Sequence, residues 1–194
     1  MGAALMDADW SVELGHDDPS LEFPWASPDG TQRFVDLSRH LEAICEIPEA
    51  AQYPELARFL LELNGKFSPW LTAKCDVWID NELGEAEDIY DAKLKMCSYI
   101  DLVRRNESER FSFEQHEQWV KSTAMTLRNI GPHPIGCELI VRRCWYPTGS
   151  RADDDPVPGF YITLYVSGYG DNEAEALARW AGGLTRVSSI VLGV

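Results

Sequence analysis

The chain has 194 residues, of which 45% are hydrophobic and 25% are charged, a balance that excludes a disordered chain and favours a globular protein. Its formal net charge of −15, with no run of Lys and Arg longer than two residues, disfavours nucleic acid and anionic membranes as partners. No apolar segment approaches the roughly 20 residues that cross a bilayer, and the N-terminus lacks a signal-peptide pattern. Five cysteines without a CxxC pair are typical of reduced thiols. We therefore expect a cytoplasmic protein.

A short motif recurs along the chain and indicates an internal repeat. Arg33–Arg39 and Ser98–Arg104 share an aromatic residue, a β-branched residue, Asp and Leu in the same order, and Tyr161–Leu164 is a weaker third copy. A tryptophan, a glycine and an acidic segment precede each copy, at a period of about 62–68 residues. Each unit is therefore predicted to hold a strand with a tryptophan, an acidic loop and a returning strand. The three tryptophans, which we expect to be core anchors, are Trp10, Trp78 and Trp145.

Amphipathic helices are predicted after the strand pairs, over residues 54–63, 113–130 and 173–184. Ser112 can cap the second helix in a capping box. Asp171 or Asn172 can cap the third, and Gly182-Gly183 weaken its end. The chain closes with an apolar segment at residues 188–192, which is predicted to form a final strand.

The predicted order of elements is ββα, ββα, ββα, β. It defines an α+β fold in which an antiparallel sheet is built from three ββα-like repeats and a C-terminal strand, with the helices on one face. No Gly/Ser/Pro-rich linker divides the chain, so we expect a single domain over residues 1–194. The repeat units within it are predicted at about 9–65, 73–131 and 136–184.

Alternation along the predicted strands assigns the β-branched and Leu positions to the helix-covered face. The opposite face then carries an aromatic residue followed two positions later by a carboxylate or hydroxyl. The residues of this candidate binding surface are Phe34, Asp36, Tyr99, Asp101, Tyr161, Thr163 and Tyr165. Aromatic rings offer contact area, and carboxylates accept hydrogen bonds from amines, guanidinium groups or sugar hydroxyls. A half-solvated sheet face and a homodimer interface are the alternatives.

Three further features of the sequence bear on a functional site. His16, Asp17 and Asp18 in the first acidic loop are a candidate metal site or acid–base group, although their spacing matches no cation-binding loop and a solvated loop is the alternative. Residues 168–170 read Gly-Tyr-Gly between a predicted strand and a predicted helix, and they are predicted to be a simple connection rather than a dinucleotide fingerprint. His116 is predicted to lie at the surface or at a boundary.

Function is predicted from charge and from the absence of catalytic motifs. The sequence contains no GxSxG, Walker or HExxH motif, and no cofactor is predicted. The favoured hypothesis is a non-enzymatic, acidic interaction module that binds a basic protein partner, in the manner of an inhibitor or immunity protein. The alternatives are a small carboxylate-based hydrolase, with or without a divalent cation, and a domain that binds a small molecule.

Overall fold

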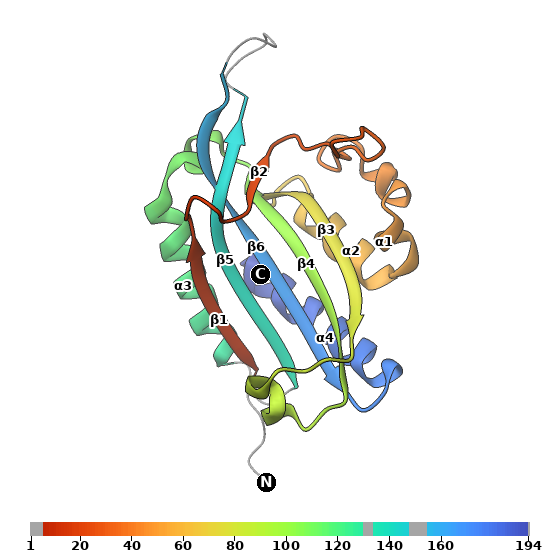
Figure 1. Ribbon diagram of the computed structural model, residues 1–194. Helices are drawn as coiled ribbons and strands as arrows, with labels where there is room; N and C mark the ends of the chain where they lie inside the picture. Colours follow the sequence, from red (N-terminus) through yellow and green to blue (C-terminus); the bar gives the residue numbers. More distant parts are fainter. Residues whose placement is uncertain (1–5, 130–133, 148–154, 194) are drawn as a thin grey trace.

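In the computed structural model, which describes residues 6–129, 134–147 and 155–193, a mixed sheet of six strands carries four α-helices on one face (Figure 1). The strands are β1 (Asp7–Glu13), β2 (Ser20–Glu22), β3 (Trp70–Asp80), β4 (Leu94–Arg104), β5 (Ile135–Tyr146) and β6 (Val157–Gly170). The α-helices are α1 (Pro48–Gln52), α2 (Pro54–Leu63), α3 (Phe113–Arg128) and α4 (Glu173–Val191). Three 3₁₀ turns accompany them: η1 (Leu41–Glu46), η2 (Glu85–Tyr90) and η3 (Glu107–Phe111).

The strand order is β1-β5-β6-β4-β3, and β2 continues along the outer edge of β5 after β1. β3 pairs with β4, β4 with β6, and β5 with β6, all antiparallel. β1 and β2 pair with β5 in parallel. The α+β class and the helices on one face agree with the prediction, whereas the sheet is mixed and not wholly antiparallel.

The three ββα repeats are not confirmed, because the first unit has no returning strand. Its copy of the motif turns at Asp36, whose Oδ1 accepts hydrogen bonds from the backbone N–H of Ser38 at 3.1 Å and from its hydroxyl at 2.6 Å. Ser and Asp offer the backbone such local partners in competition with a sheet. In the second copy Val103 occupies the position of Ser38, and Asp101 instead accepts a hydrogen bond from Thr163 on the next strand.

The predicted final strand at 188–192 is wrong, because α4 continues through the two glycines to Val191. Val187 and Val191 extend the buried stripe of this helix at helical spacing. Gly183 lies against the sheet, where an added Cβ would be 3.0 Å from Ile135 Cγ2. Gly168 on β6 lies even closer to its neighbour, α4, since an added Cβ would be 2.1 Å from the Trp180 backbone nitrogen. These glycines allow a close helix–sheet approach.

The helix starts agree with the predicted capping signals. Ser112 Oγ accepts a hydrogen bond from Gln115 N at 3.3 Å, and Asn172 Oδ1 accepts one from Glu175 N at 3.1 Å. α3 is described to Arg128, and the predicted end of this helix at residue 130 lies outside the described residues. No helix within the described ranges is both long and apolar enough to span a membrane.

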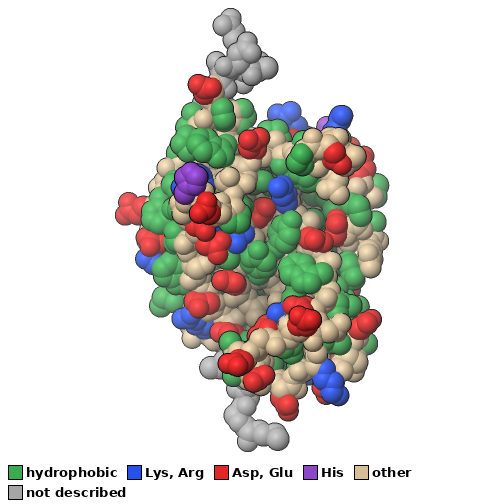
Figure 2. Space-filling view, in the orientation of Figure 1, with side chains coloured by type: hydrophobic (Ala, Val, Ile, Leu, Met, Phe, Trp, Pro, Cys, Tyr) green, Lys and Arg blue, Asp and Glu red, His purple; other side chains and the backbone are tan. Residues whose placement is uncertain are grey.

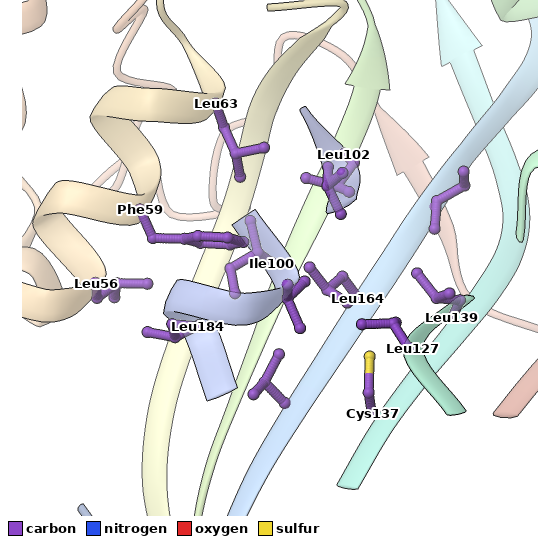
Figure 3. Packing of buried hydrophobic residues seen from close by; sticks show 14 of the residues in the cluster. Leu56, Phe59, Leu63, Ile100, Leu102, Leu127, Cys137, Leu139, Leu164 and Leu184 are labelled. Carbon is purple, nitrogen blue, oxygen red and sulfur yellow. The ribbon is translucent and has the colours of Figure 1, made fainter. Parts of the chain in front are cut away.

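The main core fills the space between the sheet and the helices. Figure 3 shows how the apolar side chains of the strands and helices converge there. The predicted inward positions of β4 and β6 are confirmed, since Ile100, Leu102 and Leu164 are fully buried. The three predicted tryptophan anchors are not: Trp78 is 37% exposed, and Trp10 and Trp145 are only half-buried. The fully buried tryptophans are Trp70 and Trp180.

The prediction that His116 lies at the surface or at a boundary is wrong. This residue of α3 is fully buried. Its Nδ1 lies 2.8 Å from the Ser112 carbonyl oxygen, and its ring lies against Phe160. Burial, aided by the positive charge of Arg104, lowers the pKa of His116 to about 4. The imidazole is therefore neutral in the folded protein at neutral pH.

Candidate functional site: the open face of the sheet

The sheet has a face without helices, here called the open face, which is turned toward the viewer in Figure 1. One end of it is covered by β2 and the chain that follows, where Leu21 packs with Val103 and Tyr161 in a second apolar cluster. Trp25 holds this cover in place by donating a hydrogen bond from Nε1 to the Ala73 carbonyl at 2.8 Å. η2 lies over the other end, and between the two the open face is accessible; Figure 2 shows hydrophobic side chains in its middle with acidic side chains around them.

A row of aromatic rings crosses the accessible part of the open face. Trp78 on β3, Tyr99 on β4 and Tyr165 on β6 lie side by side, with ring centroids 6.4 Å apart for Trp78 and Tyr99 and 6.1 Å apart for Tyr99 and Tyr165. Asp76 is the cross-strand neighbour of Tyr99, and Glu138 is that of Tyr165. The row is therefore bordered by carboxylates on both sides.

Two cations of this face, Lys95 and Arg142, are already paired. Lys95 Nζ lies 2.8 Å from Glu87 Oε1 and 3.5 Å from Asp80 Oδ2. Arg142 Nη2 lies 2.7 Å from Glu13 Oε2, and its Nη1 donates to Thr163 Oγ1 at 3.1 Å. Because these charges are largely balanced within the molecule, they offset the remaining carboxylates only in part, and Arg142 still opposes the rise in the pKa of Glu138.

Glu138 and Asp76 are carboxylates without a cation partner. Both are exposed, and neither has an ion pair within 4.0 Å among the described residues. Partial burial raises the pKa of Glu138, and the nearby Glu13 and Asp9 carboxylates raise it further. Asp9, the neighbour of Glu138 on β1, forms an ion pair with Arg128 at 3.1 Å. The open face thus presents concentrated negative charge beside its aromatic row.

Asp101 lies beneath this surface and is 5% exposed. Its Oδ1 accepts a hydrogen bond from Thr163 Oγ1 at 2.7 Å. Burial raises the pKa of Asp101 to about 6, against the opposing effects of the Thr163 hydrogen bond and of the Lys74 and Arg142 charges. Asp101 therefore supports the face from below and is not available for direct contact with a protein partner.

The structure brings together most of the predicted binding surface. Tyr99 and Tyr165 lie at the accessible surface, whereas Tyr161, like Asp101 and Thr163, is buried. Phe34 and Asp36 lie elsewhere, because their segment is not a strand. Phe34 packs edge-on against Phe23 at 4.9 Å, and Asp36 binds Ser38 and Arg39.

Phe34 and Asp36 instead line a cavity of about 730 Å³ between their loop, η1, α1 and the β3 edge. Ile47 and Leu60 supply apolar walls, and Lys74 supplies a charge. The volume falls within the range of sites for small molecules.

The candidate metal site lies in the connection between β1 and β2, with no enclosing structure. The side chains of His16 and Asp17 are fully exposed, and Asp18 Oδ2 accepts a hydrogen bond from Gly15 N at 2.5 Å. Within the described parts of the chain, no three His, Cys, Asp or Glu side chains are grouped so that they could hold a metal ion. The second acidic loop, η2, lies at the opposite end of the sheet (Figure 1), so these two acidic loops do not converge.

Trp78, Asp76 and Glu138 also belong to the accessible part of the open face, although they were not predicted as part of the binding surface. A signal for two of them was present, because Asp76 and Trp78 are two residues apart on one strand, the same aromatic and acidic alternation as Tyr99 and Asp101. Comparison of the chain with models of known families, with characterised proteins and with solved structures found no match. Function is therefore inferred from the chemistry of the open face.

Proposed function

We propose that this protein is a non-enzymatic binding module that takes the basic surface of a protein partner on its open face, in the manner of an inhibitor or immunity protein. One observation carries the proposal: carboxylates without an ion pair among the described residues border a row of accessible aromatic rings, on a sheet face that none of the four α-helices covers. The net charge of −15 adds long-range attraction for a basic partner.

The physical basis is complementarity of contact and charge. Tyrosine and tryptophan supply large contact areas at low cost in side-chain entropy and attract cations to their ring faces. Carboxylates such as Asp76 and Glu138 can accept hydrogen bonds from Arg or Lys and exclude acidic competitors. A homodimer through this face is disfavoured, because two copies would place these carboxylates opposite one another.

Oligoarginine peptide is a suitable probe, with binding measured by isothermal titration calorimetry at low and moderate salt. The charge variant Asp76→Asn/Glu138→Gln is expected to bind at least tenfold more weakly than the wild type. The matched control is Glu114→Gln/Glu173→Gln, which removes the same charge from exposed positions on α3 and α4. The control should change the affinity by less than about threefold, because distant surface charges are screened.

Two results would overturn the proposal. The wild type could fail to bind the peptide at low salt, or the control could lose as much affinity as the charge variant. In the second case net charge, and not the open face, would be responsible.

The 730 Å³ cavity supports a second candidate function, the binding of a small molecule. A thermal-shift screen of nucleotides and sugars at moderate salt tests it, because a ligand that binds the folded state raises the melting temperature. Ala43→Trp should abolish any such shift by filling the cavity, whereas Ala178→Trp on the exposed side of α4 should leave it unchanged. A shift that persists in Ala43→Trp would place the ligand elsewhere.

A further inference from the structure

A pocket of about 360 Å³ opens at the end of the open face that lies beneath η2, and it is here called the η2 pocket. η2 crosses in front of the sheet at the end where β1 begins (Figure 1). The lining residues used below are Asp7, Asp9, Trp78, Tyr90, Glu138 and Tyr165. They come from β1, β3, η2, β5 and β6, so the pocket exists only in the complete fold.

The η2 wall of the pocket is held in place by several bonds. Glu87 Oε1 accepts hydrogen bonds from Lys95 Nζ at 2.8 Å and from the Tyr169 hydroxyl at 2.7 Å, and its Oε2 accepts one from Gly84 N at 2.9 Å. Tyr90 stacks on Tyr169 with ring centroids 3.8 Å apart and an interplanar angle of 14°. A wall fixed in this way is formed before any ligand arrives, which lowers the entropic cost of binding.

The walls carry an excess of hydrogen-bond acceptors. Asp7, Asp9 and Glu138 line the pocket, while its one lysine among the described lining residues, Lys95, is already bound to Glu87 and Asp80. Arg128 takes one oxygen of Asp9 from outside the pocket. A ligand that fits these walls must therefore be positively charged and rich in donors.

The Tyr90 hydroxyl is a second, independent indication of a ligand. Tyr90 is 8% exposed, and its hydroxyl makes no hydrogen bond of good geometry to a described residue, although the Asp7 carboxylate lies close enough to interact with it weakly. Burial and the nearby Asp7 and Glu87 carboxylates raise the pKa of this phenol, so it is neutral at neutral pH. Buried polar atoms of this kind usually have partners, supplied by the protein, by water or by a ligand.

We propose that the η2 pocket binds the guanidinium group of an arginine side chain that the basic partner presents. This inference rests on the proposed function and gives it an anchor point. Guanidinium suits the pocket better than ammonium, because its planar fork has five donors for several carboxylates and its flat faces can stack on Trp78 and Tyr165. An anchor of this kind, in a preformed pocket beside a broader charged face, is typical of the few residues that dominate an interface.

Agmatine, a small alkylguanidinium, is the probe for the pocket, and spermidine, which carries one more positive charge and no guanidinium, is the comparison. We expect agmatine to bind the wild type and to compete with oligoarginine, and spermidine to bind at least several-fold more weakly. Asp7→Asn/Glu138→Gln should weaken agmatine binding at least tenfold. Asp76→Asn, on the same face but outside the pocket lining, should change it less than about twofold.

Tyr90→Phe tests the pocket without a change of charge. Because the hydroxyl makes no hydrogen bond of good geometry to a described residue, the variant should keep a melting temperature close to that of the wild type. Agmatine binding should still weaken by a few-fold. Retained affinity in this variant, together with retained affinity in Asp7→Asn/Glu138→Gln, would overturn the pocket assignment.

The remaining outcomes separate the two proposals. If oligoarginine binds but agmatine neither binds nor competes, the η2 pocket inference fails and the proposed function stands. If agmatine binds and oligoarginine does not, the proposed function fails and the pocket serves a free guanidino compound. Spermidine binding as tightly as agmatine would show a response to charge alone and would overturn the choice of guanidinium.

Discussion

The two faces of the sheet are built from the same strands but differ in chemistry. On β4, Ile100 and Leu102 point into the dry core beneath the helices and are fully buried, whereas Tyr99 and Asp101 point to the open face. Alternation along a strand thus places each side chain of the open face next to one that packs in the core. The comparison teaches that the open face can change its side chains at little cost to the core, provided that its buried polar layer is kept.

Each face also encloses an acid or base whose pKa burial shifts in the direction that favours the neutral form, as it does for several other side chains. On the helix side the pKa of His116 falls to about 4, and on the open side that of Asp101 rises to about 6. The two shifts have opposite effects on stability between pH 4 and pH 6. The contributions of these two groups to the pH dependence of stability should therefore largely cancel in this range.

Replacing one tryptophan on each face should give the largest difference in stability between the two faces. Trp180 is fully buried and donates a hydrogen bond from Nε1 to Ser98 Oγ at 2.9 Å, so Trp180→Ala should lower the free energy of unfolding by about 3–5 kcal/mol. Trp78→Ala on the open face should lower it by less than about 1 kcal/mol and should weaken peptide binding. Urea unfolding measures both. Equal destabilisation would mean that Trp78 is part of the core.

His116 provides the next largest effect. Its pKa falls from 6.5 in the unfolded chain to about 4, so between these values the unfolded chain binds a proton that the folded chain does not. Stability contributed by the neutral imidazole is therefore complete above pH 6.5 and is lost as the pH falls toward 4, by about 3 kcal/mol. His116→Gln should lose less stability than the wild type when urea unfolding is compared at pH 7 and pH 4. An unchanged pH dependence would contradict the assigned shift.

Asp101 should give a slightly smaller effect of opposite sign. Its pKa rises from 3.8 to about 6, so in this range the folded chain holds a proton that the unfolded chain releases, and stability falls as the pH rises through 6. Asp101→Asn keeps an acceptor for Thr163 and should be more stable than the wild type at pH 7 by about 2–3 kcal/mol. The gain should vanish near pH 4. Asp76→Asn, an exposed change on the same face, is the control and should show no comparable gain.

Thiol labelling should reveal the smallest difference, without a measurable change in stability. Cys45 in η1 is exposed, whereas Cys137 under the helices and Cys97 on the open face are buried, and burial raises the pKa of both buried thiols. A maleimide reagent should modify one cysteine rapidly in the native protein, and Cys45→Ser should remove this phase. Cys97 also lines the η2 pocket, so rapid labelling of this thiol would show that the pocket opens to solvent at this wall.

Local signals predicted a large part of the fold. The β3–β4 and β5–β6 pairs follow from alternation and from their order in the chain, and the starts of α3 and α4 follow from Ser112 and Asn172, whose side chains cap the next turn. α4 was predicted too short because a glycine pair weakens an isolated helix. Its close packing on Ile135, which a sequence does not display, compensates for that weakness.

The candidate site was predicted only in part, because some of its residues are placed by local alternation and others by pairing of distant segments. Tyr99 and Tyr165 share a face because their strands are neighbours, and alternation alone identifies that face. Asp36 matched the motif, but a serine two residues later gave it a local partner, and the chain turned. Glu138 could not be placed, since its proximity to Asp9 depends on the parallel pairing of two distant segments.

That parallel pairing fixes the order in which the molecule is completed during synthesis. Glu13 and Arg142 bond across β1 and β5 although 129 residues separate them, so β1 leaves the ribosome long before its partner strand exists. The η2 pocket needs Asp7 from the first strand and Glu138 from β5. A chain that stops before β5 therefore has no such pocket, and the pocket forms only after segments from both ends of the sequence have paired.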